Sequence, residues 1–177
     1  MKVKLRDIPI LGMLIALSII LTRFASVRIP IGGIEGIRIG FGTLPIILGG
    51  IFFGPWLGMM VGAFADVVGF ILSPLGPYMP HFTLTSALYG AIPGMIVHAF
   101  SFSTVEKRIV LGITIAQVGV GGMLTPYFLH TIFGMPWQLL IIPRLFTVPI
   151  NIALSSLLCL SLHRVFASSF TAKKESL

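Results

Sequence analysis

From Ile39 to Val105 the chain carries one formally charged side chain, that of Asp66. A soluble fold would need far more charge on its surface over such a length. The rest of the chain is similar, since 56% of all residues are hydrophobic and 10% are charged. We therefore expect an all-α integral membrane protein without a separate soluble domain, in which residues 1–177 form a single transmembrane domain.

Breaks in the apolar sequence divide it into six stretches, and a membrane-spanning helix needs roughly 20 apolar residues. The stretches cover residues 8–24, 39–53, 55–73, 81–101, 107–129 and 138–166. Gly54-Pro55 separates the second from the third, and the proline-rich segment 73–80 separates the third from the fourth. We expect six transmembrane helices. Five is the alternative, because the second stretch is short and contains Gly40, Gly42 and Pro45.

The basic residues predict the orientation of these helices, because Lys and Arg concentrate on the cytoplasmic side of a membrane. With six spans, most of them fall on one side: Lys2, Lys4, Arg6, Lys107, Arg108, Arg164, Lys173 and Lys174. Both termini are therefore expected in the cytoplasm. The net charge of +7 follows mostly from this topology and from contact with the anionic lipid bilayer, so no nucleic-acid partner is expected.

Three arginines depart from this rule. Arg23, Arg28 and Arg38 fall in or beside the first external connection, where Glu35 is the single acid. Arginine on that side predicts an anionic ligand that arrives from outside. Snorkelling of the side chain to the membrane interface is the alternative, and it suits Arg23 better than the other two.

The carboxylate of Asp66 would cost roughly 2.5–3.5 kcal/mol inside hydrocarbon on insertion scales. At helical spacing it shares a face with Gly58, Gly62 and Gly69, where another backbone can approach closely. Tight packing explains the glycines but not the aspartate. We interpret Asp66 as part of a functional site inside the bundle, with a structural contact between helices as the alternative.

Arg144 lies a few residues inside the last apolar stretch, after Pro143, and Pro149 precedes Asn151 by two residues. A buried guanidinium offers a planar set of donors suited to a carboxylate or a phosphate. An ion pair with Asp66 would satisfy both charges without a ligand. The two roles need not exclude each other.

Aromatic and polar side chains gather at the expected external mouth. The residues concerned are Tyr78, His81, Thr83 and Thr85 before and in the fourth stretch, with Tyr127, His130 and Trp137 at the same face. Rigid loops with such side chains suit a flat heteroaromatic ligand. An aromatic belt at the membrane interface would account for the same residues.

Several enzyme classes lack their motifs in this sequence. It contains no phosphate-binding GxxxxGK[ST], so ATP hydrolysis by that route is excluded. Neither HExxH nor paired cysteines nor clustered carboxylates indicate a metal, and the single Cys159 excludes an internal disulfide. We expect no catalytic residue, no metal and no cofactor.

Two stretches of the sequence resemble a known family. They read GIRIGFGTLPIILGGIFFGPWLGMMVGAFADVVGFILSPLGPYMPHFTLTSALYGAIPG and, later, IPRLFTVPIN. Over essentially its whole length the chain resembles the substrate-binding (S) component of energy-coupling factor (ECF) transporters, and the folate-specific branch most closely. The pantothenate branch and several others share much of the pattern.

The resemblance implies a high-affinity vitamin receptor in the cell membrane, not an enzyme. It also implies partners, a transmembrane coupling subunit of the EcfT type and two cytoplasmic ATPases. Gly12 and Ala16 would dock on the coupling subunit, although the family usually has alanine at both positions and internal packing would also explain the pair. The loop 25–38 would act as a lid, and the loaded component would topple in the membrane to deliver its ligand.

The external arginines and the aromatic cluster, together with the resemblance, predict a folate site. An arginine (Arg28, Arg38 or Arg144) would bind the carboxylates of folate, with aromatic and amide groups around the pterin. Asp66 would recognise the amino-pyrimidine edge of the pterin or orient Arg144. The ligand-binding candidates are Arg28, Arg38, Asp66, Tyr78, His81, Thr83, Trp137, Arg144 and Asn151. A membrane-embedded enzyme and an assembly subunit are the more remote alternatives, because neither accounts for the external arginines together with the proline-rich loop.

Overall fold

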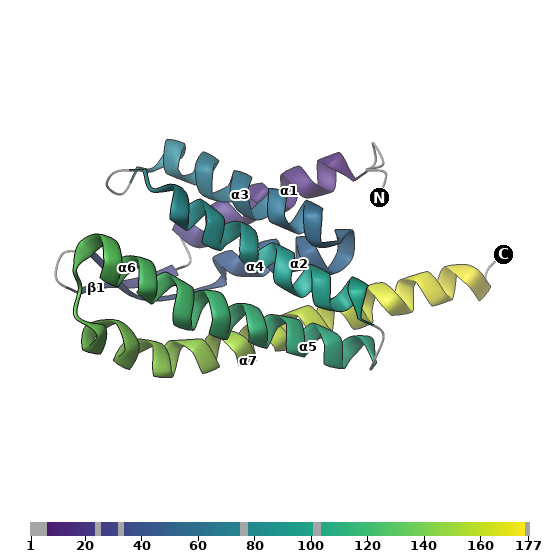
Figure 1. Cartoon of the computed structure of the whole chain (residues 1–177). Coiled ribbons are helices and arrows are strands. Elements are labelled where there is room, and N and C mark those ends of the chain that lie inside the picture. Colours follow the sequence, from purple (N-terminus) through teal and green to yellow (C-terminus); the bar gives the residue numbers. More distant parts are fainter. Residues whose placement is uncertain (1–6, 24–25, 32–33, 75–77, 101–103, 176–177) are drawn as a thin grey trace.

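The computed structural model describes residues 7–23, 26–31, 34–74, 78–100 and 104–175, and of residues 26–31, 34–39 and 165–175 it describes the backbone alone. Its helices lie side by side in an elongated bundle (Figure 1). The elements are α1 (Ile8–Arg23), β1 (Ser26–Ile31), β2 (Ile34–Gly40), the 3₁₀ turn η1 (Phe41–Thr43), α2 (Leu44–Phe53), α3 (Pro55–Leu72), α4 (Pro80–Ala99), α5 (Val105–Ala116), the π-helical stretch η2 (Gln117–Leu124), α6 (Thr125–Phe133) and α7 (Trp137–Glu175).

The described helices match the six predicted spans. Four are long and apolar enough to cross a bilayer, namely Pro55–Leu72, Pro80–Ala99, Val105–Phe133 and Trp137–Arg164. Two shorter apolar helices, Ile8–Arg23 and Phe41–Phe53, supply the remaining pair. The predicted ends hold to within a few residues, except that α7 continues to Glu175.

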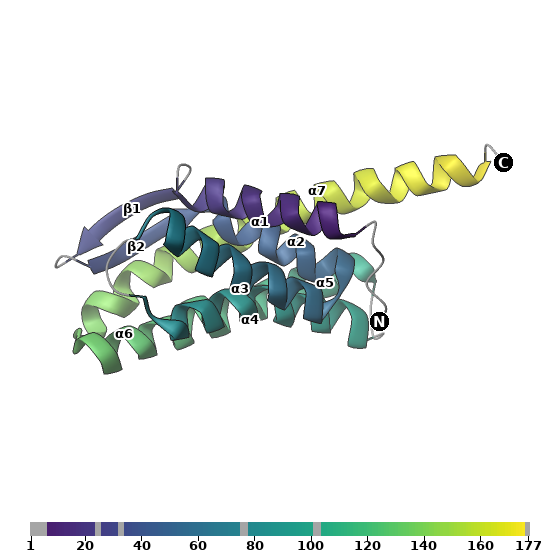
Figure 2. The ribbon, with the colours of Figure 1, turned by 90° about the horizontal axis from the view of Figure 1, so that it is seen from above.

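The predicted lid loop contains an antiparallel hairpin of β1 and β2. In β1, Val27, Ile29 and Ile31 alternate with polar or proline residues, a period of two that favours a strand. The hairpin lies at the end of the bundle where α6 also lies, and β2 packs against α7 (Figure 2). Because β2 runs to Gly40, the second helical span begins at Phe41 and not at the expected residue 39.

Glycines let α2, α3 and α4 approach to backbone contact. A Cβ atom on Gly90 would lie 2.1 Å from the carbonyl oxygen of Gly58, and one on Gly50 would lie 2.0 Å from that of Gly90. The packing interpretation of these glycines is therefore confirmed. The expected common face is divided, however, because Gly62 meets α4 whereas Gly69 meets α1.

Two apolar clusters fill the bundle. The first joins α2, α5 and α7 through Leu44, Ile47, Leu48, Ile51, Ile109, Ile113 and Cys159. The second joins α2 and α3 through Ile46, Val61 and Ala65, with side chains of α1 packed against it. Cys159 is 1% exposed, as expected for a cysteine that packs as a small hydrophobic residue.

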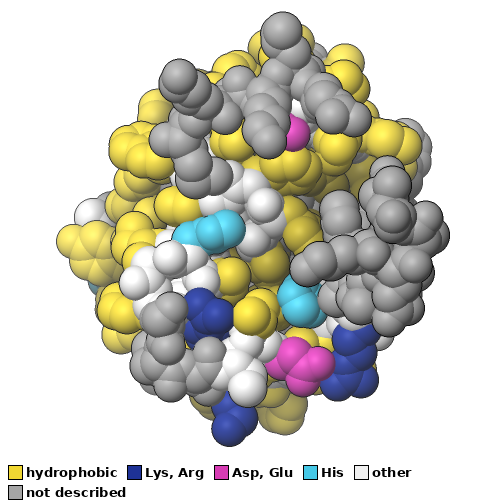
Figure 3. All heavy atoms as spheres, turned by 90° about the vertical axis from the view of Figure 1, so that its right-hand side faces the viewer, with side chains coloured by type: hydrophobic (Ala, Val, Ile, Leu, Met, Phe, Trp, Pro, Cys, Tyr) yellow, Lys and Arg dark blue, Asp and Glu magenta, His cyan; other side chains and the backbone are white. Residues whose placement is uncertain are grey.

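The start of α1 and the end of α7 lie at the same end of the bundle (Figure 1). Charged and histidine side chains appear at this end among apolar ones (Figure 3). Arg108 Nη1 donates to the carbonyl oxygen of Val97 at 2.9 Å, near the C-terminus of α4, and Arg164 pairs with Glu106 at 3.0 Å. Trp56, at the first turn of α3, is 73% exposed at this end.

Candidate ligand-binding site

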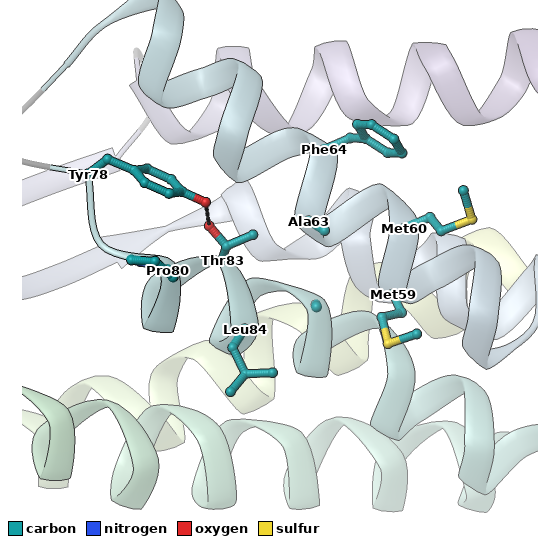
Figure 4. Close-up of a pocket in the computed structure, with 9 residues that line it drawn as sticks. Met59, Met60, Ala63, Phe64, Tyr78, Pro80, Thr83 and Leu84 are labelled. Atoms are coloured by element: carbon teal, nitrogen blue, oxygen red, sulfur yellow. Dashed lines mark hydrogen bonds between the residues drawn. The ribbon is translucent and has the colours of Figure 1, made fainter.

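Asp66 on α3 is connected to the start of α4 by a chain of hydrogen bonds. Its Oδ2 accepts a hydrogen bond of 2.7 Å from Thr83 Oγ1, which lies 2.8 Å from the hydroxyl of Tyr78. Figure 4 shows Tyr78 and Thr83 turned toward each other. The threonine hydroxyl has one hydrogen and gives it to Asp66, so Tyr78 is the donor of the second bond. The structure thus brings together three of the predicted site residues.

Replacing Thr83 by valine, which has nearly the same shape, removes both of these hydrogen bonds. We expect the free energy of unfolding of this variant to be lower by about 1.5–3 kcal/mol, because the partly buried Asp66 carboxylate loses its hydrogen-bond donor. Thermal or denaturant unfolding in detergent measures the change. Thr131→Val is the matched control, since the exposed hydroxyl of Thr131 bonds only to Tyr127 of its own helix. If Thr83→Val and Thr131→Val lose the same unfolding free energy, the contact of Thr83 with Asp66 has no special role in stability.

Arg144 on α7 donates from Nη1 to the carbonyl oxygen of Gly121 in the π-helical stretch. That carbonyl has no donor in its own helix. The N–H of Thr125 bonds to Val120, and the next residue, Pro126, has no N–H. Pro126 and the wide π turn therefore leave a helix carbonyl available inside the bundle, and Arg144 satisfies it.

Two further polar side chains reach the same glycine. A Cβ atom on Gly121 would lie 2.5 Å from the hydroxyl oxygen of Tyr89 and 3.6 Å from Oε1 of Gln117. We call Tyr89, Gln117, Gly121 and Arg144 the Gly121 cluster. Of these side chains, the sequence pattern indicated Arg144 but not Tyr89 or Gln117. The available signal was the lone amide of Gln117 in the middle of an apolar stretch, four residues before Gly121.

The alternative ion pair between Asp66 and Arg144 does not form among the described side chains, where Asp66 bonds to Thr83 and Arg144 to Gly121. Within the same described part of the chain, three predicted site residues bury a polar atom that has no hydrogen-bond partner. These atoms are His81 Nε2, Arg144 Nε and Asn151 Oδ1. Buried polar atoms usually have partners, so these positions are candidates for contact with a polar ligand.

Aromatic rings of the predicted residues pack in tilted pairs. The rings of His81 and Phe128 have centroids 5.1 Å apart, and those of His130 and Trp137 are 4.5 Å apart. Trp137 also lines, with Tyr127, a groove of about 450 Å³ between η2, α6 and the start of α7. The side chains of Trp137 and Tyr127 are therefore the wall of a groove at this end of the bundle.

A second groove, of about 460 Å³, lies between α3 and α4 (Figure 4). Tyr78 and Thr83 border it, but its wall is mostly apolar and includes Met60, Phe64 and Leu84. Such a wall offers few partners to an ionised ligand. The polar groups of Asp66 and of the Gly121 cluster are better suited to one.

The remaining predicted residues lie on α1 and on the hairpin. Arg28 and Arg38 are opposite each other in the strand register, but their side chains are outside the described residues, so their contact with a ligand stays a prediction. Gly12 and Ala16 are exposed on α1, and a Cβ atom on Gly12 would have no neighbour within 4 Å. Internal packing therefore does not explain Gly12.

Comparison with known proteins identifies the family. The family model described as "ECF-type riboflavin transporter, S component" matches residues 2–168. The chain belongs to the ECF-type S components. A curated relative of this S component is the folate transporter FolT of Clostridium novyi (strain NT). The two are 36% identical over 135 residues, which are 76% of this chain and 74% of the relative.

Two solved structures share the fold of this S component. The crystal structure of FolT bound with folic acid has a TM-score of 0.72 and 30% identity, over 88% of this chain and 95% of the other. A structure described as the S component of a bacterial ECF transporter has a TM-score of 0.64 over 93% of this chain and 97% of the other, and at 22% identity it supports the fold alone. The predicted S-component fold, the multi-pass membrane location and the role of a transport component, not an enzyme, are confirmed.

Proposed function

We propose that this S component, as a single transmembrane domain, binds folate and delivers it inward as part of an ECF transporter. The FolT relative at 36% identity and the FolT structure with folic acid at 30% identity support folate. The name of the matching family model refers to riboflavin. The chemistry of the site therefore has to decide between these two vitamins.

The observation that carries the proposal is the arginine inside the bundle. Arg144 is partly buried, donates to the carbonyl of Gly121, and has a buried Nε with no partner among the described residues. A cation withdrawn from water is stabilised by an anionic partner. Folate has two carboxylates on its glutamate, whereas riboflavin has no ionised group at neutral pH. Arg144 therefore favours folate.

The other predicted residues receive roles within this proposal. We assign carboxylate binding to Arg144, with Arg28 or Arg38 of the hairpin as further candidates. His81, Trp137 and Asn151 would surround the pterin. Asp66, held by Thr83 and indirectly by Tyr78, would accept hydrogen bonds from the amino-pyrimidine edge of the pterin.

Equilibrium binding to the detergent-purified chain tests the proposal. Folic acid, riboflavin and pantothenate are titrated separately in a calorimeter. Nanomolar binding of folic acid alone is the expected result. Tight binding of riboflavin or pantothenate alone would leave the family assignment intact but show that folate is not the substrate. No binding to a demonstrably folded sample would favour an assembly subunit.

We further propose that the coupling subunit docks on the face of α1 that carries Gly12 and Ala16, with both termini and the ATPases on the cytoplasmic side. Small residues on this exposed face permit close helix approach, and Met13 beside them is 75% exposed. Replacing Gly12 and Ala16 together by leucine is expected to abolish copurification with the coupling subunit and ATPases. Folate affinity should not change, because this face carries none of the proposed ligand contacts.

Ala153→Leu is the control for the docking experiment, because Ala153 is also exposed, on α7. It adds one leucine side chain to an exposed helix face away from α1 and should leave the complex intact. If the double leucine variant still assembles normally, the docking face lies elsewhere.

A further inference from the structure

The side chain of Gln117 is 3% exposed, which makes it one of the most buried polar groups in the described part of the chain. Its Nε2 has no hydrogen-bond partner there. The other glutamine of the chain, Gln138, is exposed at the start of α7. An apolar side chain of similar length would fill the position of Gln117 without burying an unpaired donor.

The surroundings of Gln117 suggest what its amide binds. Its Oε1 lies 3.6 Å from the position of a Cβ on Gly121, and Arg144 donates from Nη1 to the carbonyl of the same glycine. Arg144 Nε is a second buried donor without a partner among the described residues. Two buried donors without a partner among the described residues thus belong to side chains that both reach Gly121, Gln117 through its Oε1 and Arg144 through its Nη1. Such an arrangement suits a group with two adjacent acceptor atoms.

The π-helical stretch makes this arrangement possible. Gln117 is its first residue, and π turns inside α-helices occur frequently at functional sites. At Gly121 any larger residue would collide with the Tyr89 hydroxyl. The glycine therefore leaves room for polar groups from α4, η2 and α7 in the interior of the bundle.

We propose that Gln117 is a ligand-binding residue that determines specificity, and that with Arg144 it binds a pair of adjacent acceptor atoms of the vitamin. The inference rests on the proposed folate function. In folate, each carboxylate of the glutamate, to which we assign Arg144, presents such a pair. The oxo group with the neighbouring ring nitrogen of the pterin presents another, and its binding here would move Arg144 from the carboxylates to the pterin. A site that hydrogen-bonds its ligand in this way rejects analogues without the acceptors, because its buried donors would then stay unpaired.

The test compares Gln117→Met with Gln138→Met. Both changes replace an amide by an apolar side chain of similar length, but one is inside the Gly121 cluster and the other is exposed. Folic acid affinity is measured by calorimetry and the unfolding temperature in detergent with and without folic acid. For Gln117→Met we expect at least tenfold weaker binding and an unfolding temperature without ligand that is unchanged or raised. Gln138→Met should behave as the unchanged chain.

Two fragments identify the acceptor pair. 6-Hydroxymethylpterin and N-(4-aminobenzoyl)glutamate each compete with labelled folic acid for the unchanged chain and for Gln117→Met. The fragment whose competition weakens in the variant contains the atoms that Gln117 binds.

The outcomes separate this inference from the proposed function. Full folic acid affinity in Gln117→Met would overturn the inference and leave the folate proposal intact. Lower stability without ligand, together with unchanged affinity, would make the amide structural and overturn it equally. If the unchanged chain binds riboflavin instead of folic acid, the folate proposal fails. The same variant titrated with riboflavin then confirms or overturns the role of Gln117.

Discussion

Replacing Arg144 by alanine is expected to weaken folate binding at least tenfold, a loss of about 1.4 kcal/mol. The variant removes the guanidinium that we assign to the ligand carboxylates. It also leaves the carbonyl oxygen of Gly121 without its donor. Calorimetric titration of folic acid measures the affinity. An unfolding curve shows whether the variant is folded, because an unpaired carbonyl also reduces stability.

Two companion variants make the Arg144 result specific. Arg144→Lys keeps the positive charge but loses the planar set of donors, so it should bind more weakly than the unchanged chain. Arg164→Ala removes an exposed arginine that pairs with Glu106 at the end of the bundle where the termini lie, and it should bind folate normally. A folded Arg144→Ala variant with unchanged affinity would exclude Arg144 from the site.

Replacing Gly90 by alanine is expected to destabilise the fold by about 3 kcal/mol or more, at the upper end of the usual cost of overpacking. The added methyl group would lie 2.1 Å from the carbonyl oxygen of Gly58, a backbone atom that cannot rotate away. On an uncrowded helix face, replacing glycine by alanine would stabilise the fold by roughly 1 kcal/mol. At Gly90 the steric clash outweighs this gain, so the net change is a loss of stability. Thermal unfolding in detergent measures it.

Gly12→Ala is the matched control for Gly90→Ala. Gly12 is also helical, but a Cβ there has no neighbour within 4 Å, so the variant should be as stable as the unchanged chain or slightly more stable. If Gly90→Ala is as stable as Gly12→Ala, α3 and α4 have room to separate and accommodate the added methyl group.

The six spans were predictable because apolar length and the positions of glycine and proline determine them almost alone. Gly54 and Pro55 break the chain between α2 and α3, and the proline-rich segment before α4 ends the third span as expected. The burial of Cys159 was also predictable from its apolar sequence neighbours.

The hairpin and the polar contacts were harder to predict. The alternation in β1 was short, and it fell in a segment that the family resemblance described as a loop. Asp66 and Arg144 were the two conspicuous charges, and pairing them was a natural alternative. Their partners are instead a hydroxyl and a carbonyl, which sequence patterns do not identify. The carbonyl of Gly121 depends on the π turn and on Pro126, a detail of backbone geometry.

The two tryptophans lie at opposite ends of the bundle and can serve as intrinsic fluorescence probes of those two ends. Trp56 begins α3 at the end where the termini lie, and Trp137 begins α7 at the other end, beside His130. They are the only two tryptophans in the sequence. With Trp56 changed to phenylalanine, the remaining fluorescence reports events at the proposed vitamin end. With Trp137 changed instead, it reports the end that faces the ATPases in our proposal. Ligand capture and complex assembly can then be timed separately in one protein without an attached dye.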